Sequence, residues 1–111
     1  MSQHDLLDTL RSLALPDDCP ELHGQDLPIS KHAIRRYQER VESVGRRRAE
    51  ERLRQLVLDA HWYPLPRPWT QIVLHPGSHF GYSPQNPDLC IIERGGVVRT
   101  VLSRRGLSHK P

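Results

Sequence analysis

The pattern of hydrophobic and polar positions divides the chain into a helical first part and a strand-like second part. Apolar residues recur at helical spacing over residues 4–14, 30–44 and 47–60. Ser30 is a suitable N-cap for the second of these helices, and Gly45 is a suitable residue to end it. Prolines that follow residue 63 prevent the third helix from continuing.

The second part of the chain favours β-structure. β-rich segments separated by turn residues predict strands at 70–75, 78–83, 88–93 and 97–103. Arg94-Gly95-Gly96, between the last two, is typical of a tight hairpin turn. Helices followed by strands predict an α+β fold, in which N-terminal helices pack on a C-terminal antiparallel sheet of about four strands.

The chain is long enough for one compact domain. We expect residues 1–28 to form an N-terminal helix and a polar connector, and residues 29–111 to form the α+β domain. The connector begins at Pro16, which limits the first helix on its C-terminal side.

The helix that begins after Ser30 carries a set of side chains suited to chemistry. His32, Arg36 and Glu39 stand at i, i+4 and i+7, so they stack on one helical face, with Arg35 and Arg40 beside them. Cleavage of a phosphodiester without metal needs a base that titrates near neutral pH, a cation for the phosphate and a second acid–base group. The same face is also what a solvated helix presents, with Arg35 and Arg36 free to pair with Glu39.

Charge is distributed unevenly along the chain. The net charge is +3, acidic residues concentrate in the first 26 positions, and arginine dominates afterwards over only two lysines. Arginine binds phosphate through two parallel hydrogen bonds, so this bias favours a polyanionic partner, although a GC-rich genome would also enrich arginine. The asymmetry suggests that residues 1–26 fold over the basic face and mask it; a solvated linker is the alternative.

The last predicted strand offers a second wall for a site. Arg99 and Ser103 share one predicted face with Val97 and Val101, and Thr100 lies on the other. Both faces carry apolar residues, so alternation alone leaves open which face is buried.

The remaining cysteines, histidines and aromatic residues give weaker signals. Cys19 and Cys90 form neither a disulfide framework nor a zinc site, and we expect Cys90 to be buried in a strand. His75 and His79 could meet across a turn, but no further ligand completes a metal site. Trp62, Tyr63 and Trp69 could stack on bases, but we favour a role in packing the helices onto the sheet. His61, at a helix end, fits the helix dipole.

Two segments together resemble a known group of proteins. Ser30-Lys31-His32-Ala33-Ile34-Arg35-Arg36-Tyr37-Gln38-Glu39-Arg40 resembles the S-[KR]-H-A-x-x-R-x-x-E-R helix of small bacterial and phage proteins, and residues 90–102 resemble their closing hairpin. These proteins are grouped with the RelE-like and BrnT-like toxins in the barnase–colicin–RelE superfamily of metal-independent ribonucleases. The similarity covers residues 29–105. It implies a two-helix pair on a four-stranded antiparallel sheet, with His32, Arg36, Glu39 and Thr100 as the active-site set.

We therefore expect a metal-independent endoribonuclease of toxin-like or phage origin that leaves a 2′,3′-cyclic phosphate. His32 would act as general base or acid, Arg36 would clamp the phosphate, and Glu39 would orient His32 or transfer protons. Nucleic acid would also contact Arg35, Arg40, Arg99 and Ser103. The alternative is a non-catalytic nucleic-acid-binding or protein-interaction module of phage or prophage origin, in which this face is only an electrostatic patch.

The expected partners are RNA, with or without the ribosome, and an antitoxin protein, and no cofactor is expected. The N-terminus lacks a secretory signal, and no apolar run has the length of a membrane span, so the expected location is the cytoplasm.

Overall fold

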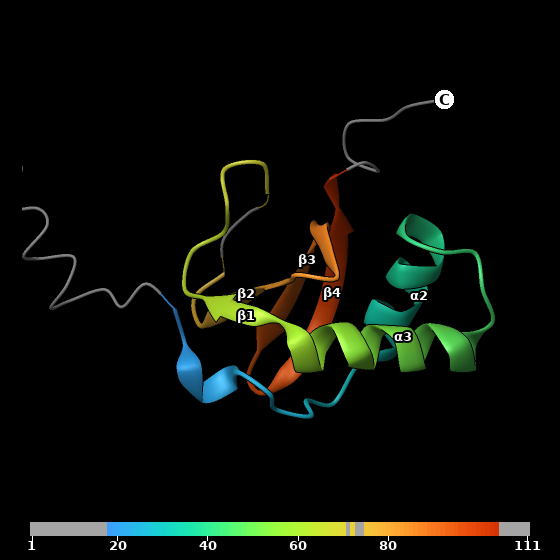
Figure 1. The fold of residues 1–111 in the computed structure, drawn as a ribbon, viewed down its shortest axis with the longest axis horizontal. Helices are drawn as coiled ribbons and strands as arrows, with labels where there is room; N and C mark the ends of the chain where they lie inside the picture. Colours follow the sequence, from blue (N-terminus) through green and yellow to red (C-terminus); the bar gives the residue numbers. More distant parts are fainter. Residues whose placement is uncertain (1–17, 71, 73–74, 105–111) are drawn as a thin grey trace, which may run out of the picture.

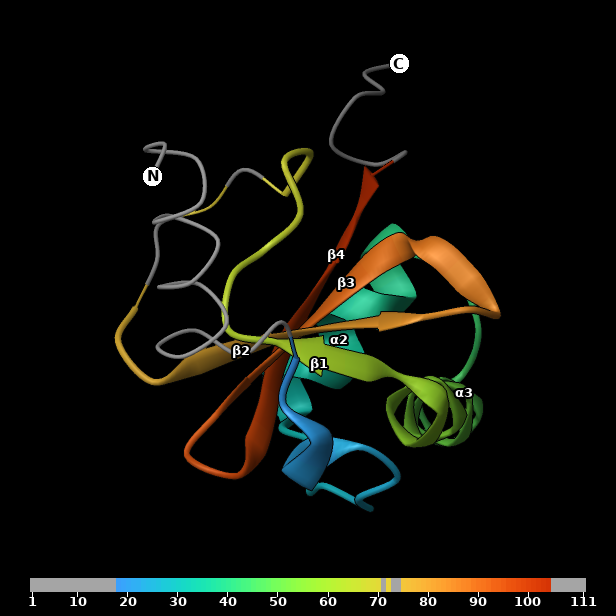
Figure 2. The same cartoon turned by 60° about the vertical axis from the view of Figure 1, so that its left-hand side comes forward.

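The computed structural model describes residues 18–70, 72 and 75–104. In chain order, the elements are η1 (Pro20–Leu22), α2 (Lys31–Arg40), α3 (Arg46–Asp59), β1 (His61–Tyr63), β2 (Ser78–Ser83), β3 (Asn86–Arg94) and β4 (Val97–Ser103). The strands form one antiparallel sheet in the order β1-β2-β3-β4, and the two α-helices lie on one side of it (Figures 1 and 2). This architecture confirms the predicted α+β fold. The helix predicted over residues 4–14 lies outside the described residues.

The start of α2 was predicted correctly, and its end was not. The Ser30 hydroxyl accepts a hydrogen bond from the Ala33 amide at 3.1 Å, as an N-cap should. The helix ends at Arg40 rather than near residue 44, because the Val41 and Glu42 amides both bond to the Tyr37 carbonyl. Gly45 is the N-cap of α3 instead of the residue that ends α2. Among the described residues, no helix has the length and apolar character that a bilayer crossing requires.

The first strand lies earlier in the chain than the sequence pattern predicted. β1 follows α3 after a single residue, and its central residue Trp62 pairs with Gly81 of β2. The strand predicted at 70–75 is wrong: the described residues of that segment (Thr70, Ile72 and His75) belong to the connection between β1 and β2. Trp69 and Ile72 of this connection pack against the sheet face opposite the helices. The aromatic strand β1, rather than residues 70–75, pairs with β2.

The sheet separates two apolar cores. The larger core joins buried side chains of both helices to Trp62 and to sheet residues such as Ile91 and Val98. The smaller core, on the opposite face, contains Phe80, Tyr82, Cys90, Ile92 and Leu102, with Tyr63, Trp69 and Ile72 packed against it. Burial of Trp62 therefore agrees with the packing role favoured for the aromatic residues, and Cys90 is buried in a strand as predicted. Both Cys90 and Cys19 are free thiols.

A bulge in β4 changes which residues share a face. Ile92 pairs with Thr100 and Glu93 pairs with Val98, so Arg99 is an extra residue on β4. Val98 consequently faces the helices together with Val101, whereas strict alternation predicted that it shares a face with Thr100. The bulge leaves Thr100 facing away from the helices and Arg99 exposed beside it.

The free edge of β4 is covered by the chain that leads into α2. Ile29 forms a parallel bridge with Val98, whose amide donates to the Pro28 carbonyl and whose carbonyl accepts from the Ser30 amide. Farther along the same edge, the Arg40 guanidinium donates to the Val101 carbonyl at 3.0 Å. These contacts protect an exposed strand edge and fix α2 against β4.

The segment before α2 is only partly the solvated connector that was predicted. Cys19 and Leu27 are buried in the helix-side core, and Leu22 packs against it. The His23 ring accepts a hydrogen bond from the Trp62 amide at 3.2 Å. The short helix η1 holds this segment against β1, so removal of residues 18–27 would open the core. Asp26, one of the acidic residues of the N-terminal part, pairs with Arg54 of α3 at 3.4 Å.

Gly81 is the position in the sheet where a side chain fits least well. A Cβ atom there would stand 2.8–2.9 Å from the Trp62 ring, which is fully buried and has no room to move. We expect Gly81→Ala to lower the free energy of unfolding by about 1–3 kcal/mol, measured by chemical denaturation. Gly77→Ala is not a suitable control because its backbone has a positive φ; Gly45→Ala, with open space around it, is. Equal stability of the Gly81 and Gly45 variants would contradict this packing.

Two ionisable side chains of the smaller core, Cys90 and Tyr82, should make the protein less stable at alkaline pH. Burial raises the pKa of the Cys90 thiol from 9.0 to about 11, and burial together with the Cys90 contact raises the pKa of Tyr82 to about 12. The native state therefore keeps protons that the unfolded chain releases, so stability is complete below pH 9 and falls as the pH rises through 11. Cys90 alone should account for about 2 kcal/mol by pH 11. Denaturation curves from pH 7 to 11 test this, and Cys90→Ala should flatten the decline; an unchanged pH dependence in that variant would contradict the assignment.

Candidate active site

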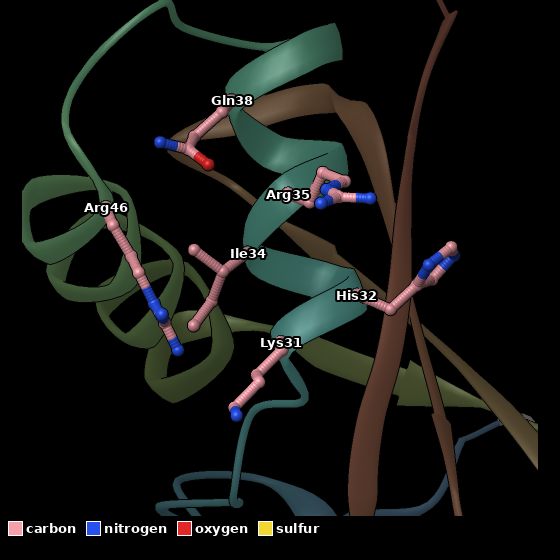
Figure 3. A pocket seen from close by; sticks show the side chains of 6 residues that line it. All are labelled: Lys31, His32, Ile34, Arg35, Gln38 and Arg46. Atoms are coloured by element: carbon pink, nitrogen blue, oxygen red, sulfur yellow. The ribbon is translucent and has the colours of Figure 1, made fainter.

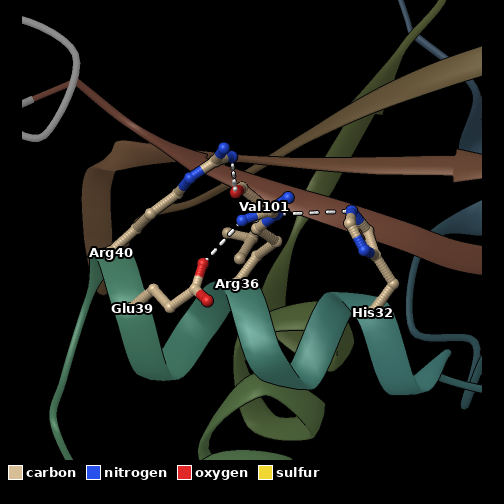
Figure 4. Close-up of polar contacts among 5 residues, drawn as sticks. All are labelled: His32, Arg36, Glu39, Arg40 and Val101. Carbon is tan, nitrogen blue, oxygen red and sulfur yellow. Dashed lines mark hydrogen bonds and ion pairs between the residues drawn. The ribbon is translucent and has the colours of Figure 1, made fainter.

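The helix α2 joins the three predicted catalytic side chains in one chain of contacts (Figure 4). Arg36 Nε donates to His32 Nε2 at 3.4 Å, and Arg36 Nη1 contacts Glu39 Oε1 at 2.6 Å. His32 and Glu39 are exposed and Arg36 is half-buried. The spacing of four and three residues places each pair on adjacent helical turns.

These contacts show that Arg36 bonds directly to His32, whereas Glu39 bonds to Arg36. In this contact Nε2 of His32 is the acceptor and Nδ1 is left for another partner. A neutral imidazole is the form that can accept a proton. Glu39 contacts Arg36 rather than His32, so in this arrangement it orients the histidine only through the guanidinium.

His32 also lines a cavity on the side of the sheet opposite the helices. The cavity has a volume of about 370 Å³. Its lining residues come from α2, from the β1–β2 connection and from β2, β3 and β4: His32, Ile72, His75, Ser78, Ile92, Arg94, Arg99, Thr100 and Leu102. Its apolar lining residues are Ile72, Ile92 and Leu102, and the other lining residues are polar or charged.

The β3–β4 hairpin supplies the cations of this cavity. Gly95 and Gly96 both have positive φ, at 64° and 82°, which allows the tight turn predicted from the sequence. The bulge at Arg99 brings its side chain back toward the turn, where Arg99 Nε donates to the Arg94 carbonyl at 3.1 Å. Arg94 and Arg99 therefore lie at the same end of the hairpin, close to Thr100.

Of the predicted site residues, the structure brings together His32, Arg99 and Thr100 around the cavity. Arg36 does not line the cavity but bonds to His32. Arg35 lies in a different groove. Arg40 is used at the edge of β4; burial and the neighbouring Arg36 lower the pKa of its guanidinium. Ser103, at 6% exposure, is buried at the end of β4 and does not line the cavity.

Two residues of the cavity were not predicted as part of the site, His75 and Arg94. His75 was considered only as a metal ligand together with His79, and Arg94 only as a turn residue. The Pro76-Gly77 turn that follows His75 was visible in the sequence, but its direction was not. A strand at 70–75 would have placed His75 in the sheet, whereas the observed connection carries it over the second face to the cavity.

His79 lies apart from this cavity and has a partner of its own. Its Nδ1 atom bonds to Glu93 Oε1 at 2.7 Å, and the other carboxylate oxygen accepts from the Gly96 amide at 2.7 Å. Glu93 is only 4% exposed. The pair holds the hairpin turn from the helix side of the sheet. Within residues 18–70, 72 and 75–104, no group of three or more His, Cys, Asp or Glu side chains is placed to hold a metal ion.

The cavity combines groups that serve acid–base and phosphate chemistry. Two imidazoles can exchange protons, two guanidiniums can bind phosphate oxygens, and a hydroxyl can add a hydrogen bond. Comparison of the chain with protein-family models, with curated proteins and with solved structures gives no match. The functional argument therefore depends on the geometry and chemistry of the site.

Proposed function

We propose that the protein is a metal-independent endoribonuclease that cleaves RNA through a 2′,3′-cyclic phosphate. The observation that carries this proposal is the convergence of His32 and His75 with Arg94 and Arg99 on one cavity. Transfer of a phosphoryl group to the neighbouring 2′-oxygen needs one group to accept a proton, one to donate a proton and cations to stabilise the phosphate. The cavity contains each of these.

In this proposal, His32 removes the proton of the 2′-hydroxyl. The 2′-oxygen then attacks phosphorus, the bond from phosphorus to the 5′-oxygen breaks, and His75 protonates that leaving oxygen. Arg94 and Arg99 bind the non-bridging oxygens as negative charge builds on them, and Thr100 adds a hydrogen bond. When RNA binds, Arg36 turns from His32 toward the phosphate, which frees Nε2 of His32 to accept the proton; before that step Glu39 orients Arg36.

The family resemblance supports the same proposal. The resemblance to the RelE-like and BrnT-like toxins implies a pair of helices on a four-stranded antiparallel sheet. The structure has this architecture. From that resemblance to toxin-like or phage proteins we infer that the chain acts in the cytoplasm on RNA, either free or on the ribosome, and that an antitoxin protein restrains it.

Incubation of the purified protein with mixed total RNA in EDTA tests the proposal. We expect cleavage that resists EDTA and fragments that end in a 2′,3′-cyclic phosphate, detected by end-specific ligation. A parallel reaction in translation extract covers a requirement for the ribosome. Absence of cleavage in both, with binding to RNA retained, would contradict the proposal and favour the non-catalytic nucleic-acid-binding module.

A further inference from the structure

A second cavity lies along α2, beside the first residue of α3 (Figure 3). It is a groove of about 430 Å³. Its lining is Lys31, His32, Ile34, Arg35, Gln38 and Arg46. All but Arg46 come from α2, and Arg46, the first residue of α3, extends alongside Ile34.

Within the described part of the chain, no carboxylate pairs with the cations of this groove. Among the described residues, Lys31, Arg35 and Arg46 take part in no ion pair, whereas Arg36, Arg52 and Arg54 each contact a carboxylate. Of the residues that the structure describes, no acidic one lines the groove. The three cations therefore present an excess of positive charge at one place on the surface.

Helix stability does not explain the position of Arg46. Together with Arg47 and Arg48 it forms the first turn of α3, which contains no acidic residue. Cations at the start of a helix oppose its dipole, and each costs about 0.3–1 kcal/mol there. Of these cations, Arg46 lines the groove, so a binding role accounts for its position where local stability does not.

We propose that this groove binds a phosphate group of a single-stranded polynucleotide, next to the phosphate held in the first cavity. His32 lines both cavities, so one strand that passes over His32 occupies both. A guanidinium can bind two oxygens of one phosphate at once. A single strand is flexible enough to follow the surface around α2. This inference rests on the proposed function, because the strand in the groove is the substrate of the proposed active site. It implies that the substrate is longer than a dinucleotide.

Binding of a 2′-O-methylated RNA of about twelve nucleotides tests the groove without cleavage, because the modified 2′-oxygen cannot attack. The measurement is fluorescence anisotropy in EDTA at several salt concentrations. We expect Arg46→Ala to raise Kd about threefold to fivefold and to reduce the salt slope by about 0.7, the effect of one lost phosphate contact on a single strand. A dinucleotide, which fills only the first cavity, should bind both forms of the protein equally.

Arg47→Ala is the matched control: it removes the same charge from the adjacent exposed position, which does not line the groove. If the two variants change Kd and the salt slope equally, the proposal that the groove binds a phosphate is wrong, even if the wild type cleaves RNA. If Arg46→Ala instead weakens binding of a polyglutamate peptide and not of the oligonucleotide, the groove receives an acidic protein segment and the proposal is wrong. If Arg46→Ala alone loses oligonucleotide affinity but the wild type does not cleave RNA, the binding role of the groove is supported and the proposed ribonuclease activity is contradicted.

Discussion

Replacement of His32 by alanine is expected to reduce RNA cleavage by about 10²–10⁴-fold, the usual contribution of a general acid–base group. His32 lies between the two cavities, and its imidazole is the group on α2 that can remove the 2′-hydroxyl proton. The side chain is exposed and, within the described part of the chain, its hydrogen bond is to Arg36, so the fold should be unaffected. Rates are measured in EDTA on a single-stranded RNA, together with Kd for its 2′-O-methylated form.

The controls for this prediction come from the other histidines. His75→Ala should cause a loss of similar size, because the leaving oxygen then lacks its proton donor. His61→Ala removes an exposed histidine of β1 that lines neither cavity, and it should leave the rate unchanged. Kd should change by no more than about twofold in the His32 variant. Cleavage by His32→Ala at the wild-type rate would show that the site is wrongly placed.

The part of the site on α2 could be predicted from the sequence because it is local. The positions of His32, Arg36 and Glu39 along a helix determine which side chains meet, and the capping residue Ser30 determines where the helix begins. The observed contacts follow from that spacing alone. The same local reasoning predicted the hairpin turn at Gly95-Gly96.

The remainder of the cavity depends on contacts between distant segments. Arg99 reaches the cavity because one extra residue in β4 shifts the alternation of side chains, and no sequence pattern showed that bulge. His75 reaches it because β1, rather than residues 70–75, pairs with β2. The short aromatic segment 61–63 was interpreted as part of the break after the helix over 47–60, and only burial of Trp62 against the sheet makes it a strand.

Glu93 is the buried charge on which the cation-bearing hairpin depends, and Glu93→Ala is expected to lower the free energy of unfolding by about 2–3 kcal/mol. Both carboxylate oxygens are used: one bonds to His79 Nδ1 and the other to the Gly96 amide, each at 2.7 Å. Alanine leaves both donors without their acceptor and leaves a space beside the core. The thermal midpoint should fall by about 10 °C.

Glu93→Gln separates the hydrogen bonds of this residue from its charge. The amide oxygen can still accept from Gly96, and the amide nitrogen can donate to an unprotonated His79 nitrogen, so most of the stability should return. The hairpin turn is held by Glu93 on one face of the sheet and carries Arg94 and Arg99 into the cavity on the other. Oligonucleotide affinity should therefore fall in Glu93→Ala, at a temperature where the variant is folded, and recover in Glu93→Gln. If the glutamine variant binds as weakly as the alanine variant while it is as stable as the wild type, the carboxylate acts through its charge and not by holding the turn.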